Sequence, residues 1–223
     1  EAISHIVKSA IKTPNKVKTV HDGIDPNRFH QNKPSGFIHN QLHLSSDKKL
    51  IANISAISPH KDYETFLLTA NEVLKTRNDC HFLIVGDGPD RAKIEARTKE
   101  LYLENHISFL GFRTDVPDIF RELTLFLMTS KTEGLGSTVI DAMYNKIPVV
   151  ATRAGGIPEL LEDAKEGFLC EVQDFHCLSA RVNELLDSPD LRREMSENAF
   201  LKSQQFTWDK MGERVLEIYN QAI

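Results

Sequence analysis

Apolar residues along the chain gather in short runs, several of them continuous, separated by more polar segments. Continuous runs, rather than alternating apolar and polar positions, are typical of strands that helices cover on both faces, as in a parallel sheet. The pattern therefore predicts strands at these six places: residues 16–20, 49–55, 81–86, 106–111, 123–130 and 147–152.

The segments between these runs place their apolar residues at helical spacing. Single apolar stripes predict helices around residues 66–74, 178–186 and 211–222. Asp62 and Asp90 precede two helical segments and are suitable N-cap residues. Strands that alternate with helices imply right-handed crossovers, so we expect an α/β fold with a doubly wound, Rossmann-like parallel sheet and helices on both faces.

Three units are expected along the chain. Residues 1–15 form a separate N-terminal segment, 16–205 the α/β domain, and 206–223 a closing amphipathic helix. Residues 22–49 are polar and rich in turn-forming residues, which predicts a long connection within the second unit.

Composition narrows the function classes. The 223 residues are 40% hydrophobic and 26% charged, with a net charge of −5, which argues against a nucleic-acid-binding protein. The cysteines are Cys80, Cys170 and Cys177, and this odd count without a C-x-x-C pair argues against a disulfide framework or a zinc ribbon. A reducing cytoplasm is the simpler context. No apolar run approaches the roughly 20 residues that span a bilayer.

Candidate chemistry lies in turns that follow the predicted strands, because open α/β sheets bind ligands at the carboxyl ends of their strands. In "GDGPDR", Gly86 and Gly88 supply only part of the dinucleotide fingerprint, since Arg91 stands at the third glycine position. A tight turn between strand and helix is therefore favoured over a nicotinamide site. A site for part of a nucleotide is the intermediate interpretation.

The turn "EGLGST" suits an anion. Gly134 and Gly136 permit unusual backbone angles, and Ser137 or Thr138 can cap the helix that follows. Free N–H groups at that helix start favour a phosphate.

Two carboxylates flank this turn. Glu133 would repel a phosphate alone, but it is a good acceptor for the hydroxyls of a sugar attached to that phosphate. The alternative is that Thr138 and Asp141 form a capping box while Glu133 is solvated, and the residues alone do not separate these interpretations.

Basic residues stand in three of the other turns. Lys61 in "SPHKD" could neutralise a diphosphate, although a lone lysine is more often simply on the surface. Arg113 and Arg153 hold comparable positions after later strands.

Several ordered segments resemble the C-terminal, donor-binding domain of retaining glycosyltransferases of family 4, which have the two-domain GT-B fold. These segments are "VKTVHDGIDPNRF", "SAISPHKDYETFLLTA", "FLIVGDGP", "ISFLGFRTDVPDIF", "LFLMTSKTEGLGSTVIDAM", "IPVVATRAGGIPELL" and "FTWDKMGERVLEIY". The order of the motifs makes the resemblance specific. It implies that residues 1–15 are the last element of an N-terminal acceptor domain and that residues 206–223 cross back to it.

The resemblance also implies roles for individual residues. Lys61 would hold the donor diphosphate, Glu133 the donor sugar and Asp141 the ribose, while backbone after Gly134 meets sugar and phosphate. The base would lie against the turns at Gly86–Gly88 and Gly111–Arg113. Glu133 is thus the implied catalytic residue, and the implied donor-binding residues are Lys61, Gly86, Gly88, Phe112, Arg113, Gly134, Leu135, Gly136, Ser137, Thr138 and Asp141.

Two departures concern donor binding. Asp141 stands where the family usually has glutamate, and Ala56 stands where many members have an arginine for the diphosphate. A third departure, "HDG" for the common Asn-Gly pair, is expected to matter little.

The resulting hypothesis is a nucleotide-sugar-binding domain that uses UDP-, GDP- or ADP-sugars without a metal or further cofactor. The acceptor is a saccharide or a lipid-linked molecule bound by the N-terminal domain, and the isolated domain transfers nothing. We expect a cytoplasmic protein, with peripheral attachment to the inner face of the membrane as an option. Rival hypotheses are a nucleotide-sugar epimerase, a non-catalytic binding module with a degenerate site and, least favoured, a dehydrogenase.

Overall fold

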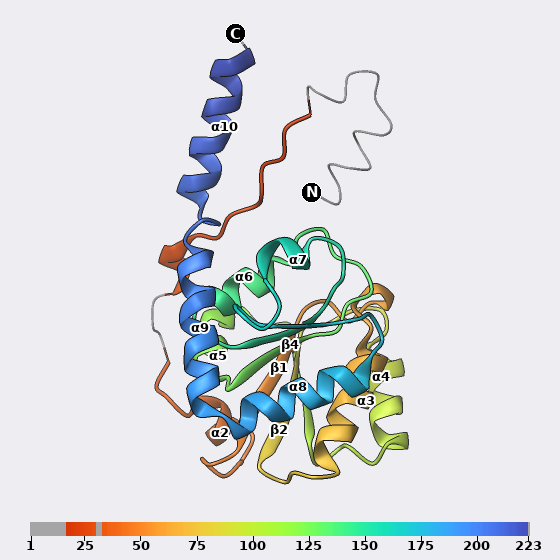
Figure 1. The fold of residues 1–223 in the computed structure, drawn as a ribbon. Coiled ribbons are helices and arrows are strands. Elements are labelled where there is room, and N and C mark those ends of the chain that lie inside the picture. The colour runs from red at the N-terminus through yellow and green to blue at the C-terminus, as the bar shows by residue number, and fades with distance from the viewer. Residues whose placement is uncertain (1–16, 30–32, 223) are drawn as a thin grey trace.

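The computed structural model describes residues 17–29 and 33–222, which form a parallel six-stranded sheet between two layers of helices (Figure 1). The strand order is β3-β2-β1-β4-β5-β6. Strands are added in one direction from β1 to β3 and in the other direction from β4 to β6, so the order reverses between the adjacent parallel strands β1 and β4. The strands are β1 (Lys49–Ile54), β2 (Cys80–Val85), β3 (Ile107–Gly111), β4 (Leu125–Met128), β5 (Val149–Thr152) and β6 (Phe168–Cys170). The helices are η2 (Pro26–Phe29), α2 (Phe37–Gln41), η3 (Pro59–Lys61), α3 (Tyr63–Leu74), α4 (Arg91–Glu100), α5 (Val116–Glu122), α6 (Ser137–Tyr144), α7 (Ile157–Leu160), α8 (Phe175–Asp187), α9 (Pro189–Ser203) and α10 (Trp208–Ala222).

Each face of the sheet packs against its own apolar layer. Leu50 and Ala52 of β1 join the core beneath α5, α6 and α9, whereas Ile51 joins the core beneath α3, α4 and α8. Neighbouring residues of a strand point to opposite faces, so successive apolar residues such as those at 50–52 contribute to both cores. The structure thus confirms the expected doubly wound, Rossmann-like α/β fold.

Strand prediction succeeds for β1–β5 and fails for the first predicted strand and for β6. Five of the six predicted strands correspond to β1–β5. Residues 17–20 of the first prediction form no strand, and the short strand β6 was not predicted. The connection at 22–49 is also less irregular than expected, because it contains η2 and α2.

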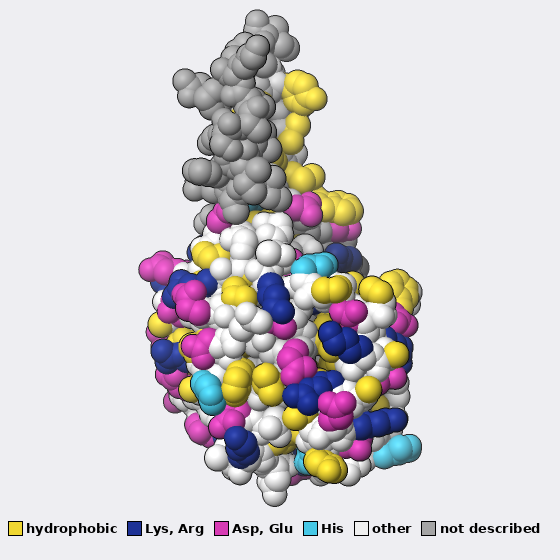
Figure 2. Space-filling model, turned by 90° about the vertical axis from the view of Figure 1, so that its right-hand side faces the viewer, with side chains coloured by type: hydrophobic (Ala, Val, Ile, Leu, Met, Phe, Trp, Pro, Cys, Tyr) yellow, Lys and Arg dark blue, Asp and Glu magenta, His cyan; other side chains and the backbone are white. Residues whose placement is uncertain are grey.

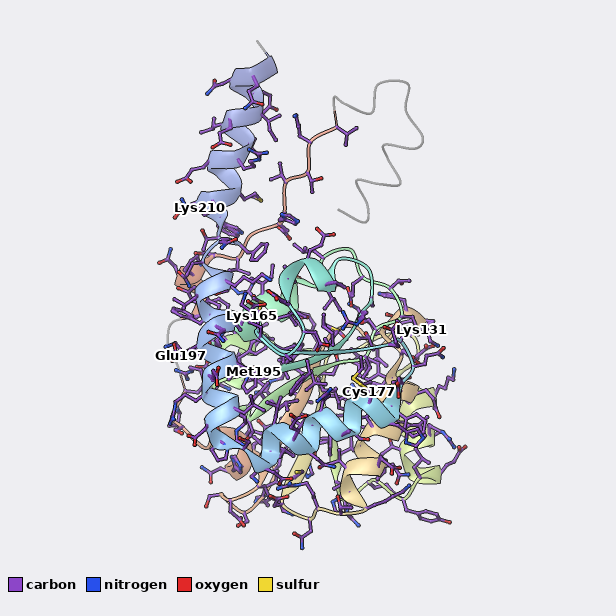
Figure 3. All side chains as sticks on the ribbon, in the orientation of Figure 1. Lys131, Lys165, Cys177, Met195, Glu197 and Lys210 are labelled. Carbon is purple, nitrogen blue, oxygen red and sulfur yellow. A yellow bond between two sulfur atoms is a disulfide. The ribbon has the colours of Figure 1, made fainter. Side chains whose placement is uncertain are left out.

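A disulfide joins Cys170, at the end of β6, to Cys177 in the first turn of α8 (Figure 3). The sequence argued against such bonds, and this expectation is wrong for this pair. The Asp174 carboxylate accepts the backbone N–H of Cys177 at 2.9 Å, which starts α8 immediately after a short turn. That turn brings two cysteines with seven residues of separation into bonding contact. Cys80 remains a free, buried thiol.

The closing helix α10 projects from the body of the domain beyond α9 (Figure 1). Its predicted amphipathic character is confirmed, and Figure 2 shows hydrophobic side chains on the projecting part of the molecule. Trp208, Leu216 and Tyr219 are exposed on this helix. Within the described part of the chain, no helix combines the length and apolar character needed to cross a membrane. The predicted N-terminal unit, residues 1–15, lies outside the described residues.

Candidate functional site

A cleft of about 660 Å³ opens at the carboxyl edge of the sheet, beside the junction of β1 and β4. Segments that follow β1, β2 and β3 form one side, and the start of α6 forms the other. This is the position at which doubly wound sheets bind ligands. The lining residues are Arg28, Ile54, Ser55, Ala56, Val85, Gly86, Asp87, Phe112, Arg113, Thr114, Val116, Pro117, Ser137, Thr138 and Asp141.

The two glycines of "GDGPDR" allow the ends of β1 and β2 to approach closely. A Cβ atom on Gly86 would lie 2.1 Å from the Ser55 carbonyl oxygen, and Gly86 has a φ of +140°. A Cβ atom on Gly88 would lie 2.4 Å from the carbonyl oxygen of Ile57. Gly86 lines the cleft, whereas the glycine at position 88 is explained by this packing against Ile57.

The turn after β3 contributes an exposed ring and a fixed cation. Phe112 lines the cleft with 79% of its surface exposed. The Arg113 guanidinium donates two hydrogen bonds to the Asp115 carboxylate, at 2.7 and 2.6 Å. This contact holds the pKa of Asp115 well below its usual range and raises the pKa of Arg113. Asp115 also pairs with Lys33 at 2.6 Å, so this carboxylate holds the Arg113 guanidinium in place while two cations share its charge.

Lys61 and Glu133 form a buried ion pair in turns that follow β1 and β4, and neither residue is among those that line the cleft. Lys61 Nζ lies 2.5 Å from Glu133 Oε1, and their side chains are only 14% and 8% exposed. The Ser130 hydroxyl donates a second hydrogen bond to the same carboxylate oxygen at 2.6 Å. Thr129 Oγ1 donates to the Lys61 carbonyl at 3.2 Å and thereby ties the lysine turn to the end of β4. The structure thus brings together the lysine and the glutamate that the sequence assigned to one donor.

The backbone of Glu133 is fixed by the turn "TRAGG" after β5. Gly155 has a φ of +54°, and a Cβ atom there would lie only 1.8 Å from the Glu133 carbonyl oxygen. A Cβ atom on Gly156 would lie 2.4 Å from the carbonyl oxygen of Gly134. Glycine is required at this contact, because any side chain would displace the loop that carries Glu133.

Helix α6 begins at Ser137, with Gly136 in the left-handed region at the N-cap position. The expectation that Ser137 or Thr138 caps the helix is therefore wrong: both residues already belong to the first turn. Leu135 precedes this start and packs against the core. Amides in a first helical turn have no acceptor within the helix, so the start of α6 suits an anion.

Asp141 lies one turn into α6 and is 3% exposed. One of its carboxylate oxygens, Oδ2, accepts a hydrogen bond from Arg28, and the other, Oδ1, has no hydrogen-bond partner among the described residues. Burial raises the pKa of Asp141 to about 6, an effect that Arg28 opposes and Asp22 reinforces. The capping-box alternative is wrong, because Gly136 holds the cap position and Asp141 pairs with Arg28.

Two residues at this edge escaped the sequence analysis. Arg28 lies 113 positions before its partner Asp141, and no local pattern connects them. Ser130 was visible as the residue after a predicted strand, but its bond to Glu133 depends on the loop conformation.

Arg153 pairs with Asp163 at 2.9 Å near the end of β5. Among residues 17–29 and 33–222, no group of three or more histidine, cysteine or acidic side chains is arranged to hold a metal ion.

Sequence relatives are glycosyltransferases from several bacteria. An N-acetyl-alpha-D-glucosaminyl L-malate synthase of Bacillus anthracis is 30% identical over 187 residues, which cover 83% of this chain and 49% of that protein. A GDP-mannose-dependent mannosyltransferase of Corynebacterium glutamicum that acts on a monoacylated phosphatidylinositol monomannoside is 29% identical and covers 95% of this chain. The chain spans about half the length of the curated relatives it matches.

Solved structures agree with this relationship. HepE from Anabaena, solved in complex with UDP and glucose, superposes with a TM-score of 0.82 at 26% identity, over 92% of this chain and 57% of that one. The C-terminal domain of a glycosyl transferase group 1 family protein from Francisella tularensis superposes with a TM-score of 0.73 at 22% identity, over 83% of this chain and 100% of that one, and supports the fold. The α/β fold matches that of GT-B glycosyltransferases. The family model of the glycosyl transferases group 1 matches residues 35–202, and the chain belongs to that family.

Proposed function

We propose that the chain is the donor-binding domain of a retaining glycosyltransferase of family 4. The complete enzyme would move a sugar from a nucleoside diphosphate sugar to a saccharide or lipid-linked acceptor. The observation that carries this proposal is Asp141 Oδ1, a buried acceptor on a residue that lines the cleft, for which the described part of the chain supplies no partner. Buried polar atoms are normally hydrogen-bonded, and Oδ1 has almost no exposed surface in the ligand-free chain, so a small movement of the Asp141 side chain would let it accept from a ribose hydroxyl.

The other side chains fit the remaining parts of such a donor. Phe112 offers an exposed ring on which a base can stack. The start of α6 offers N–H groups for phosphate. Lys61 would bind the diphosphate and stabilise it as the leaving group, while Glu133 accepts hydroxyls of the donor sugar.

The ion pair between Lys61 and Glu133 would hold both side chains in their binding positions before the donor arrives. Both groups are held in position without donor, so little side-chain freedom is lost when phosphate and sugar take their places. Bound donor would exchange the contact at 2.5 Å for two separate contacts, one from the lysine to phosphate and one from a sugar hydroxyl to the glutamate.

The relatives suggest which bases and sugars to test first as the donor. HepE was solved with UDP and with UDP-glucose, whereas the Corynebacterium relative depends on GDP-mannose. We therefore propose titrating the chain calorimetrically with UDP, GDP and ADP, and then with sugar derivatives of the base that binds. Metal-independent transfer and a cytoplasmic location, with or without attachment to the membrane face, remain part of the proposal.

The decisive variant is Glu133→Gln. It should leave the affinity for the nucleoside diphosphate unchanged or raise it, because Lys61 no longer has to leave a charged partner. Relative to the nucleoside diphosphate, the sugar nucleotide should lose roughly fivefold to tenfold, as expected for hydrogen bonds to a charged group. Glu122→Gln is the matched control, because Glu122 is also a buried carboxylate, 6% exposed, but lies at the opposite edge of the sheet near α2. Its donor affinity should not change.

Two results would contradict the proposal. Failure of the chain to bind any of the three nucleotides or their sugars at millimolar concentration would favour a non-catalytic module. Saturable sugar transfer by this chain alone would contradict the idea that it is one half of an enzyme. Formation of an epimer from the sugar nucleotide without acceptor would instead support the rival epimerase.

A further inference from the structure

Arg28 is the cation of the cleft that the sequence analysis did not consider. It belongs to η2, lines the cleft together with Ala56 and Ser137, and donates to the Asp141 carboxylate. Asp141 lies four residues after Ser137 on α6, and helical side chains tilt towards the helix N-terminus. The carboxylate therefore holds the guanidinium beside the start of α6, where an anion would bind.

The ion pair presents its positive end to the cleft. The Arg28 side chain is 42% exposed, whereas that of Asp141 is 4% exposed. A guanidinium has five N–H groups in a planar fork, and the hydrogen bond that the structure shows for Arg28 uses one of its nitrogens. Its ring contact with Phe29, at 4.9 Å, supports the face of the guanidinium and leaves the donors at its edge available.

The three cations that the sequence named in the turns at this edge are each engaged with a carboxylate. Arg113 makes two hydrogen bonds to Asp115, Lys61 is buried against Glu133, and Arg153 pairs with Asp163. Ala56 lines the cleft and brings no charge. Two or three negative charges of a diphosphate require more than one positive partner in a partly buried site.

We propose that Arg28 binds the donor diphosphate, with Asp141 as the residue that positions its guanidinium. This inference rests on the proposed function. It adds Arg28 to the groups that contact the diphosphate, which the sequence analysis assigned to Lys61 and to the backbone after Gly134. Arg28 supplies, from a connection far away in the sequence, the positive charge that position 56 lacks. Asp141 then serves two ligand groups at once, because Oδ2 orients Arg28 while Oδ1 remains for a ribose hydroxyl.

The test compares ligands that differ only in phosphate. UDP, UMP and uridine, or the corresponding series of whichever base binds, are titrated into the chain by protein-observed NMR, which follows millimolar affinities. Arg28→Ala should weaken UDP binding by about tenfold or more, because charge-assisted hydrogen bonds to phosphate are lost. Uridine binding should change by less than about twofold. Arg28→Lys keeps the charge but not the fork, and should give an intermediate loss.

Arg181→Ala is the matched control. Arg181 is also 42% exposed, also pairs with an acidic residue, Glu184, and also lies over a phenylalanine ring, that of Phe168 at 4.5 Å. It belongs to α8, in the other helix layer. This variant removes the same charge and should leave the affinity for all three ligands unchanged.

Thermal melting of each variant checks that the fold is intact, and Arg28→Lys provides the answer if Arg28→Ala does not fold. Unchanged UDP affinity in either Arg28 variant that folds would overturn the inference while leaving the proposed function standing. Equal losses for UDP and uridine would also overturn it, since Arg28 would then act through the ribose or the fold. Wild-type chain that binds no nucleotide would overturn the proposed function and this inference with it.

Discussion

Glu133 and Asp141 are both buried carboxylates paired with a cation, eight residues apart on either side of one glycine turn, yet their surroundings differ. Glu133 has two donors on one oxygen, from Lys61 and Ser130, and sits on a loop fixed by glycine contacts. Asp141 sits on a regular helix, and within the described chain it has a single charged partner and keeps one oxygen unsatisfied.

The difference indicates how each group is prepared for a ligand. Glu133 already has hydrogen-bond partners within the protein. Under the proposed function, a bound sugar nucleotide would exchange these contacts for new ones. The region around Asp141 leaves one buried carboxylate oxygen without a partner among the described residues, and the folded state carries the free-energy cost of that unsatisfied atom. Variants of the two regions separate these conditions.

The largest effect is expected from Gly155→Ala, which disturbs Glu133 and leaves the side chain of Asp141 alone. The new Cβ would lie 1.8 Å from the Glu133 carbonyl oxygen at a φ of +54°. Left-handed strain and a forced shift of the loop should together lower the free energy of unfolding by roughly 4 kcal/mol. Chemical denaturation measures this loss.

Gly36→Ala separates the two contributions. Gly36 has a φ of +79°, and a Cβ added there would have no atom of the described residues within 4 Å, so this control reports left-handed strain alone, about 1–2 kcal/mol. Equal losses in the two variants would show that the contact between Gly155 and Glu133 does not constrain the loop.

The next effect is a gain in stability from Asp141→Asn. The pKa of Asp141 rises from 3.8 to about 6 on folding, mainly through burial, against the attraction of Arg28 and with repulsion from Asp22. The folded state therefore binds this proton more tightly than the unfolded chain, and stability falls as the pH rises from about 4 to 6. Asparagine does not titrate, so above pH 6 the variant should be more stable by as much as about 3 kcal/mol.

The partner left behind does not cancel this gain, because Arg28 is 42% exposed and can be hydrated. Denaturation of the wild type and of Asp141→Asn at pH 4.5 and 7.5, roughly 1.5 units either side of the pKa of Asp141, measures this gain in stability. Nucleotide affinity should fall in the same variant. Asp62→Asn is the contrasting control: the Asp62 carboxylate is buried but accepts from Thr65 and pairs with Lys131, so stability should drop. A loss of stability at pH 7.5 in Asp141→Asn would show that the pair with Arg28 outweighs burial.

Much of the fold could be predicted because buried parallel strands and amphipathic helices leave direct traces in the sequence. β1–β5 are mostly apolar segments of four to six residues, whereas β6 is a three-residue strand that looks like part of a turn. "KVKTV" has the composition of a strand, but its described residues 17–20 find no partner, and a strand requires one.

The site could be predicted only as far as backbone position determines it. Turns that follow predicted strands identified Phe112, which lines the cleft, and Lys61 and Glu133, which meet in an ion pair. Side-chain pairing was not accessible, because Arg28 meets Asp141 across 113 positions and a single sequence holds no record of that contact. The N-cap residue of α6 is Gly136 and not Ser137 or Thr138, because the left-handed backbone before the helix favours glycine at that position.

The smallest effect is expected from Ser130→Ala, which makes Glu133 more like Asp141. The change removes the 2.6 Å hydrogen bond from the Ser130 hydroxyl and leaves Lys61 as the remaining side-chain partner that the structure shows for this carboxylate. Stability should fall by about 1 kcal/mol, the usual contribution of one hydrogen bond. Affinity for the sugar nucleotide should fall by about twofold to threefold, while affinity for the nucleoside diphosphate stays the same.

Ser196→Ala distinguishes an effect on the site from an effect on the fold. Ser196 is a buried serine of α9 whose hydroxyl donates to the Arg193 carbonyl at 2.9 Å. Its removal should cost similar stability without any change in sugar nucleotide affinity. If both variants bind the sugar nucleotide equally well, Ser130 only stabilises the loop. Orientation of Glu133 would then depend on Lys61 and on the glycine contact.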